Sequence, residues 1–263
     1  MLPYIHIIRR DVPVYGLMMM IGAALGWMLC VHRARRVAPF MSRECVTRIC
    51  IFFGAGALIG AKVYSLVLVW PYFVRDLPHF WENPQLFLER YVYGGLVFYG
   101  GLIGGFVCVA YLLISHKASF ATLELVYLPA VPLVHGIGRI GCFCAGCCYG
   151  VPTESGFGVC YPKGGLAPSG VPLVPVQLFE AAGDLLLCGI LCLPLYRKTG
   201  RRLSVYLICY GCLRFGIECF RGDAVRGFVG RLSGAQWISL ICVVTGVLIN
   251  ALLLVKKYAV PYK

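Results

Sequence analysis

Seven apolar runs, each about as long as a bilayer-crossing helix, divide this chain and constrain its fold more than any other feature. A helix needs about 20 mostly apolar residues to cross a bilayer. A lipid-exposed segment must satisfy its own backbone hydrogen bonds, so helices are the expected spanning element. We therefore predict an all-α membrane protein in which residues 1–263 form a single transmembrane domain. The seven predicted transmembrane helices are Val14–Val31, Val46–Trp70, Gly95–Ile114, Leu123–Phe143, Val176–Tyr196, Leu203–Phe220 and Ala235–Val255.

The fourth run differs from the others because prolines and glycines interrupt it. Pro129 and Pro132 each lack the backbone N–H that an α-helix needs. We expect a kinked or partly re-entrant segment at this place.

Basic residues are distributed unevenly between the connections, and this predicts the orientation. Connections on one side carry basic residues with Glu44 as their one acid, whereas acids offset the basic residues on the other side. The positive-inside rule then puts the N-terminus outside and the C-terminus in the cytoplasm. The two longer connections, 71–94 and 149–175, lie on the predicted outer face. The cytoplasmic set is Arg33, Arg35, Arg36, Arg43, Lys117, Arg197, Lys198, Arg201, Arg202, Lys256, Lys257 and Lys263.

The composition supports a membrane protein and argues against a nucleic-acid-binding one. Hydrophobic residues make up 60% of the chain and charged residues only 13%, about half the charged fraction of a soluble domain. The formal net charge is +13, but the basic residues flank apolar runs, where they set topology and meet anionic lipid. We expect membrane lipid, and no nucleic acid, as a partner.

Charged side chains inside apolar runs are costly and are therefore candidates for function. Arg214, Glu218 and Arg221 share one helix face with Tyr210, near the outer end of the sixth run. They are either structural ion pairs or a site for a lipid phosphate, which guanidinium groups bind bidentately. The candidates within the runs are Lys62, Glu124, Arg139, Glu180, Asp184, Arg214 and Glu218.

Two further pairs stand one helical turn apart. His135 and Arg139 form the first, on the fourth run. Glu180 and Asp184 form the second, and because like charges repel, one of them should be protonated or both should meet a cation.

Small residues and thiols form two further patterns. Glycines that include Gly100, Gly101 and Gly138 either let helices approach closely or make room for a ligand.

The pattern C-x-C-x-x-C-C at Cys142, Cys144, Cys147 and Cys148 favours inert packing or an ordinary disulfide, with zinc, iron–sulfur or thiol-exchange chemistry as the alternative. We expect no cofactor and no bound metal.

Six motifs, in order along nearly the whole chain, resemble those of the bacterial prolipoprotein diacylglyceryl transferase family. The segment 136–143 reads Gly-Ile-Gly-Arg-Ile-Gly-Cys-Phe and is similar to the family's Gly-x-Gly-Arg-x-Gly-Asn-Phe. The segment 210–221 matches Tyr-Gly-x-x-Arg-Phe-x-x-Glu-x-x-Arg. The others are Tyr-Gly-Leu-Met at 15–18, Gly-Gly-Leu-Val-Phe-Tyr-Gly-Gly-Leu at 94–102, Pro-Val-Gln-Leu-Phe-Glu at 175–180, and Gln236 with Ser239.

The resemblance implies seven spans, an external N-terminus and a place in the bacterial cytoplasmic (inner) membrane. It also implies transfer of diacylglyceryl from phosphatidylglycerol to the lipobox cysteine thiol of lipoprotein precursors, which forms a thioether and releases glycerol phosphate. The expected catalytic residues are Arg139 and Arg214 for the phosphate, Glu218 to orient an arginine, and Tyr99 to position the donor. The expected substrate-binding residues are Tyr15, Tyr210, Gly100, Gly101, Gly138, His135, Gln177 and Arg221.

The chain departs from the family pattern at three positions. Tyr99 replaces the histidine between the glycine pairs, Cys142 replaces an asparagine, and Cys147 replaces an acid. A tyrosine, with an ordinary pKa of about 10, is a poor base near neutral pH. His135 or the field of the arginines could take over thiol activation. Three alternatives remain: a diverged paralogue that uses another acceptor, a thiol-redox or metal-binding membrane protein, and a non-enzymatic membrane scaffold or transporter.

Overall fold

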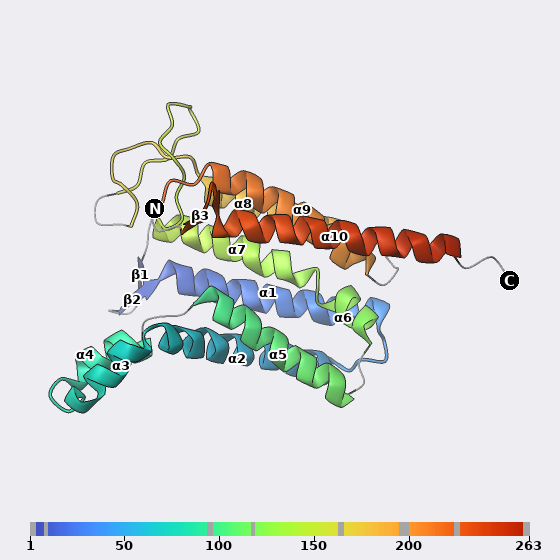
Figure 1. The fold of residues 1–263 in the computed structure, drawn as a ribbon, viewed down its shortest axis with the longest axis horizontal. Helices are drawn as coiled ribbons and strands as arrows, with labels where there is room; N and C mark the ends of the chain where they lie inside the picture. The colour runs from blue at the N-terminus through green and yellow to red at the C-terminus, as the bar shows by residue number, and fades with distance from the viewer. Residues whose placement is uncertain are drawn as a thin grey trace. The chain divides into compact units, whose positions relative to one another are not determined.

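The computed structural model describes residues 4–7, 10–93, 97–116, 119–162, 166–194, 200–223 and 227–259, and these are mostly helical (Figure 1). Two short antiparallel hairpins add strands that the all-α prediction lacks: β1 (Tyr4–Ile7) with β2 (Arg10–Pro13), and β3 (Phe228–Val229) with β4 (Leu232–Ser233). The helices are α1 (Val14–Val37), α2 (Arg43–Leu68), α3 (Trp70–Asp76), η1 (Leu77–His79), α4 (Pro84–Leu88), η2 (Glu89–Tyr93), α5 (Phe98–His116), α6 (Phe120–Val126), α7 (Ala130–Ala145), α8 (Val176–Cys192), α9 (Arg201–Cys219) and α10 (Gly234–Ala259).

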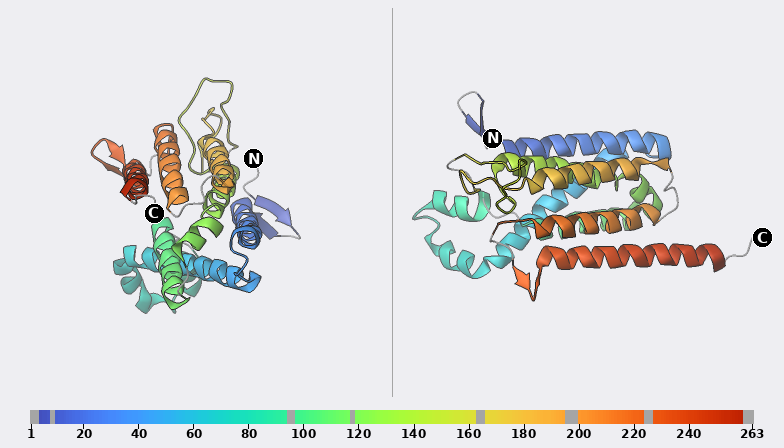
Figure 2. Two further views of the ribbon diagram at one scale, coloured as in Figure 1. Left: turned by 90° about the vertical axis from the view of Figure 1, so that its right-hand side faces the viewer. Right: turned by 90° about the horizontal axis from the view of Figure 1, so that it is seen from above.

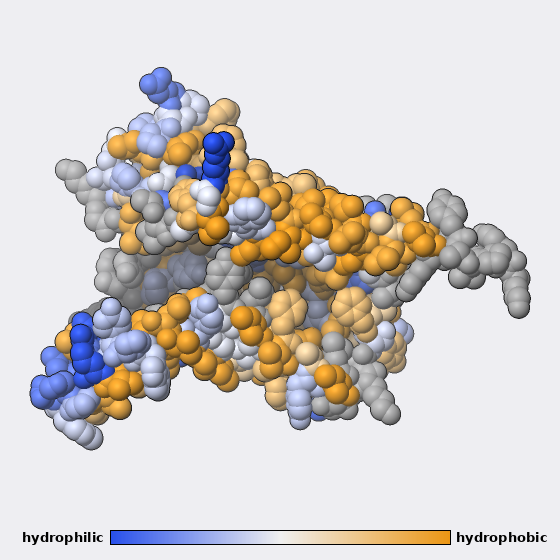
Figure 3. All heavy atoms as spheres, viewed as in Figure 1, coloured by the Kyte–Doolittle hydropathy of each residue, from blue (hydrophilic) through white to orange (hydrophobic). Residues whose placement is uncertain are grey.

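Among the residues that the structure describes, four helical segments are long and apolar enough to cross a membrane. They are Val14–Val37, Arg43–Leu68, Phe120–Ala145 and Gly234–Val255. Helices α5, α8 and α9 occupy the other three apolar runs. The prediction of a mostly helical protein with helices long and apolar enough to cross a membrane is therefore confirmed. Figure 3 shows hydrophobic residues along α10, where Ile241, Leu248 and Leu252 are each more than half exposed, as lipid-facing side chains would be.

The chain forms two compact units, Met1–Ala38 with Ala121–Lys263, and Pro39–Phe120. In the first unit α1 packs on α7, α7 on α8, α8 on α9, and α9 on α10 (Figure 2). Glycines on two faces of α7 permit this arrangement. A Cβ on Gly138 would lie 3.1 Å from Met19 of α1, and one on Gly136 would lie 3.1 Å from the Ala181 carbonyl of α8. Helix α7 is thus held between α1 and α8.

In the second unit, α2 and α5 pack through glycines on both helices. A Cβ on Gly56 would lie 2.6 Å from the Gly104 carbonyl oxygen. Gly100 lies against Gly60 and Tyr64, and a Cβ on Gly101 would lie 3.1 Å from the Ala57 carbonyl oxygen. Of the two interpretations of these glycines, close helix approach accounts for what the structure shows.

The fourth apolar run is broken, as expected, at residues 127–129, between α6 and α7. The buried Glu124 carboxylate precedes the break and accepts hydrogen bonds from the backbone N–H groups of Gly200 (2.6 Å) and Leu203 (2.7 Å). It therefore caps the start of α9, whose first N–H groups have no partner within the helix. This charge inside an apolar run has a structural role.

The two long connections contain ordered structure. Helices α3, η1, α4 and η2 fill most of the segment 71–93. The segment 149–175 is held by backbone bonds, because Gly150 donates to the Val174 carbonyl and Val151 donates to the Phe220 carbonyl (2.9 Å) at the end of α9. Tyr161 and Leu173 form a small buried cluster within it.

Candidate functional site

The Glu180 carboxylate on α8 is the centre of a buried ion-pair network. Only 1% of Glu180 is exposed. Arg139 on α7 approaches it with two nitrogens, Nε at 2.9 Å from Oε2 and Nη2 at 3.1 Å from Oε1. Arg214 on α9 donates from Nη1 to both carboxylate oxygens, at 3.1 and 3.2 Å. Three neighbouring helices therefore meet at one carboxylate.

The network continues from Arg214 along α9 to the segment that follows it. Nη2 of Arg214 lies 2.9 Å from Oε2 of Glu218, one turn along the helix. Oε1 of Glu218 accepts a hydrogen bond from the Ser233 hydroxyl at 3.0 Å. Arg221 lies 3.5 Å from Glu218 and forms a two-point pair with Asp223, at 2.9 and 2.6 Å. The stripe predicted on this face of α9 is thus a continuous set of ion pairs.

Among the described residues, each arginine of this network is paired with at least one acid. The sequence left open whether enough acids lie near the arginines, and the structure gives Glu180, Glu218 and Asp223 to three guanidinium groups. A guanidinium has five N–H donors. In its described contacts Arg139 uses Nε and Nη2 on Glu180, so Nη1 can donate to an incoming anion. These pairs hold the guanidinium groups in place and leave donors for a phosphate.

A second pair stands beside this network. His135 on α7 places Nδ1 2.7 Å from Oδ2 of the fully buried Asp184 on α8. The His135 ring contacts the Tyr210 ring edge-on, with centroids 5.7 Å apart, and Tyr210 stacks on Tyr206. Glu180 therefore meets two guanidinium cations, and Asp184 meets an imidazole. The expectation that both acids meet a cation, or that one of them is protonated, stays a prediction at Asp184.

Gln177 joins α8 to the connection that follows α7. Its side chain is fully buried, and Nε2 donates to the Cys147 carbonyl oxygen (2.8 Å) and to the Tyr161 hydroxyl (3.1 Å). Gln177 was expected to bind substrate, and in the structure its contacts fix the backbone at Cys147.

The structure brings most of the expected site residues together in the first unit. Arg139, Arg214, Glu218, Arg221, His135 and Tyr210 lie in or beside the network described above. Tyr15 on α1 lies beside Gly141, whose Cβ would be 3.2 Å from the Tyr15 ring. Gly138 packs on α1. Gly100 and Gly101 belong to the second unit, as does Tyr99 on α5, whose side chain is outside the described part of the chain.

The sequence did not predict which residues pair with the arginines and with Glu218 in this network. Glu180 was flagged as an intramembrane charge but not as the group on which two arginines converge. Its i, i+4 spacing from Asp184 on one face of α8 was the available signal. Asp223 and Ser233 lie outside the apolar runs, and nothing in their local sequence indicated a contact with the arginines.

The sulfur atoms of Cys142, Cys147 and Cys148 also gather beside this network, and they are the one group of possible metal ligands found among the described residues. All fifteen cysteines lie in the described part of the chain, and all are free thiols. Of the interpretations of C-x-C-x-x-C-C, the ordinary disulfide is therefore not formed in the structure, and inert packing and metal or thiol chemistry stay open.

Apolar helices around a buried arginine–carboxylate network define a multi-helix membrane protein with an internal polar site. The model of the family described as prolipoprotein diacylglyceryl transferase matches residues 3–252. The chain therefore belongs to this family of transferases. It is 32% identical over 238 residues to phosphatidylglycerol–prolipoprotein diacylglyceryl transferase 2 of Clostridium perfringens, with 89% of this chain and 88% of the relative covered. It is 33% identical to the corresponding transferase of Clostridium tetani (89% and 90% covered) and 32% identical to that of Francisella tularensis (82% and 78% covered).

Proposed function

We propose that this protein transfers a diacylglyceryl group from phosphatidylglycerol to the cysteine thiol of a prolipoprotein, within the lipobox sequence. The names of its relatives state phosphatidylglycerol and prolipoprotein as the two substrates of those proteins. The observation that carries the proposal is the convergence of Arg139 and Arg214 on Glu180 at the junction of α7, α8 and α9.

The reaction needs groups that stabilise the negative charge developing on its phosphate leaving group. The acceptor sulfur attacks the glycerol carbon that bears the phosphate ester, a C–S bond forms, the C–O bond breaks, and glycerol phosphate leaves with the electron pair. Guanidinium groups held in advance stabilise charge that develops on the phosphate without reorganising during the reaction. Glu180 and Glu218 supply that fixed orientation for Arg139 and Arg214.

We also propose that the seven helical segments form a single transmembrane domain of the bacterial cytoplasmic membrane, with the N-terminus outside. The basic connections and tail support this orientation. Reporter fusions test it: a periplasm-dependent reporter should be active when joined after residue 163 and inactive when joined after residue 198. The reverse pattern would show that the orientation is inverted.

The transferase activity is tested with purified protein, phosphatidylglycerol and a lipobox peptide, with the peptide mass as readout. We expect a mass gain of one diacylglyceryl group, and a loss of at least about 100-fold in rate for Arg139→Gln or Arg214→Gln, comparable to removing one oxyanion-hole donor. Arg33→Gln is the matched control. Arg33 is a buried arginine on α1 that donates to the Leu125 carbonyl (2.7 Å), and the folded fraction of this variant should keep its activity.

Loss of activity in all three variants to the same extent would show that the arginines act through folding alone.

The variant Tyr99→Phe tests whether transfer requires the Tyr99 hydroxyl. If the Tyr99 hydroxyl is a required group, this variant should be inactive. We expect it to retain activity, because a phenol is a poor base at neutral pH.

A further inference from the structure

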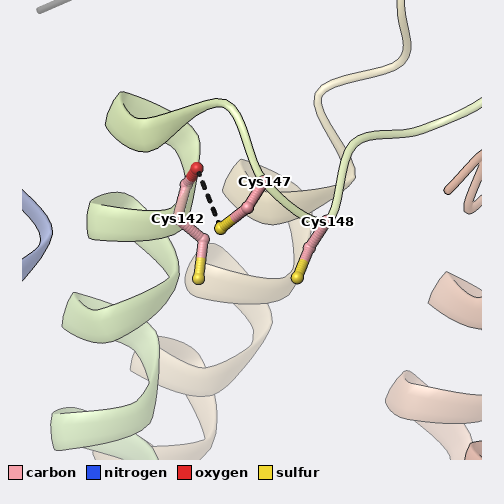
Figure 4. Close-up of side chains that lie close together, drawn as sticks. All are labelled: Cys142, Cys147 and Cys148. Atoms are coloured by element: carbon pink, nitrogen blue, oxygen red, sulfur yellow. Dashed lines mark hydrogen bonds between the residues drawn. The ribbon is translucent and has the colours of Figure 1, made fainter. Parts of the chain in front are cut away.

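Three thiols meet where α7 ends. Cys142 is on the last turn of α7, and Cys147 and Cys148 follow it in the connection. Figure 4 shows their side chains directed toward a common region, and the three sulfur atoms all lie within 4.8 Å of one another. Two thiols this close could be accidental in a chain with fifteen cysteines, but three that converge from a helix and a loop form a ligand set.

The backbone conformation of the turn after α7 brings these three sulfur atoms together. Helix α7 ends at Gly146, whose φ of 73° is left-handed, and Cys147 donates its N–H back to the Cys142 carbonyl. Cys148 is the one non-glycine residue with a positive φ (56°) in the described part of the chain. That conformation costs a non-glycine residue about 1–2 kcal/mol. The hydrogen bond from Gln177 to the Cys147 carbonyl then holds the loop.

The sulfur separations suit a thiophilic ion. Three sulfurs bound at about 2.3 Å with tetrahedral angles lie about 3.8 Å apart, so small side-chain rotations from the observed separations would suffice.

We propose that Cys142, Cys147 and Cys148 bind a zinc ion whose fourth coordination position receives the acceptor cysteine of the prolipoprotein. Zinc sites with three protein ligands keep an open position for substrate. A thiol that coordinates such an ion loses its proton. This inference rests on the proposed function and supplies the thiol activation that Tyr99 cannot give.

The chemical step balances without an oxidant or reductant. The acceptor thiol releases its proton to solvent on coordination, and its sulfur then attacks the glycerol carbon of the donor. The C–S bond forms, the C–O bond breaks, and the electron pair leaves on the phosphate oxygen of glycerol phosphate. Arg139 lies one turn before Cys142 on α7, so the phosphate-binding group and the thiol ligands stand side by side.

Zinc binding is measured first, independently of activity. The full-length protein in detergent is reduced, stripped with a chelator and titrated with Zn²⁺ in competition with a chromophoric chelator. Co²⁺ is used in parallel, because cobalt–thiolate absorption reports the ligands. We expect one ion per chain. Each of Cys142→Ser, Cys147→Ser and Cys148→Ser should weaken binding by about 100-fold or more, since even supporting residues around a metal contribute 10–100-fold.

Cys144→Ser is the matched control, because this cysteine is also at the end of α7 but its sulfur is not in the group. It should bind zinc as the parent does. No stoichiometric zinc, or equal binding by the parent and the three variants, overturns the site. A disulfide between two of the three cysteines in protein purified without reductant, with no zinc bound after reduction, assigns them to redox chemistry and also overturns it.

Transfer is then compared between the stripped and the zinc-loaded protein. We expect the stripped protein to be at least tenfold slower and zinc to restore its rate. Full transfer by the stripped protein overturns the role of the ion in activating the acceptor, while the proposed transferase function stands. Stoichiometric zinc without transfer under any condition contradicts the transferase function and leaves the metal site in place.

Discussion

The ion pair between Arg139 and Glu180 gives the sharpest test of how this site is built. Glu180→Gln removes the carboxylate on which two guanidinium groups converge and keeps the side-chain volume. At a separation of about 4 Å and an effective dielectric constant of about 20, each attraction is worth about 4 kcal/mol before desolvation is counted. Removal of one partner from a buried pair usually costs about 3–5 kcal/mol. We expect a loss of that size for Glu180→Gln.

A double-mutant cycle isolates the pair. Unfolding by sodium dodecyl sulfate in bicelles is measured for the parent, Glu180→Gln, Arg139→Gln and the double variant. The two-point contact predicts a coupling of about 2 kcal/mol or more, within the range seen for residues of one network. The matched control is the Arg75–Asp76 pair, whose side chains are 68% and 22% exposed and for which a coupling of at most about 1 kcal/mol is expected. A coupling between Arg139 and Glu180 below about 0.5 kcal/mol would refute the view that Glu180 holds the arginine in place.

Three further predictions concern single contacts. Gln177→Ala should cost about 1–3 kcal/mol, because it leaves the Cys147 carbonyl without its buried donor, and it should speed proteolysis of the connection 149–175. Glu124→Ala should cost about 2 kcal/mol as a lost helix cap but leave transfer by the folded fraction intact, as measured by the peptide-mass assay. The Tyr91 hydroxyl lowers the pKa of Asp76, so the stabilisation given by this carboxylate is complete above its ordinary pKa of about 3.9 and is lost as the pH falls through the lowered value. Pepsin cleavage of the segment 71–93 should therefore accelerate below about pH 4, and Tyr91→Phe should make cleavage depend less on pH in this range.

The helices could be predicted from the sequence because the constraint on them is local. Lipid forces each apolar run to satisfy its own backbone, so the length and composition of a run determine its structure. Pro129 marks the break between α6 and α7 for the same local reason. The strands at the N-terminus and before α10 were not predicted, because they are short hairpins outside the apolar runs.

The site was predictable only in part, because its contacts join residues far apart in the sequence. Arg139 and Arg214 could be proposed from helical spacing and from the family resemblance, but their common partner Glu180 depends on how α7, α8 and α9 pack. Glu124 shows the opposite case: a charge within an apolar run that served as a functional candidate proved to be a cap for α9. Burial cost alone therefore does not separate a functional charge from a structural one.

The thiol group shows why spacing alone could not settle the chemistry of C-x-C-x-x-C-C. Cys144 and Cys147 lie on either side of Ala145 and Gly146, and the chain turns at this glycine and brings Cys147 and Cys148 back toward Cys142. The same reversal places the thiols one turn from Arg139, the residue expected to hold the donor phosphate. A cysteine at the position of the family's asparagine would be of little use alone. Together with Cys147 and Cys148 it forms a group that could hold a metal ion, and on our proposal this group receives the acceptor sulfur in a chain that has Tyr99 where the family has a histidine.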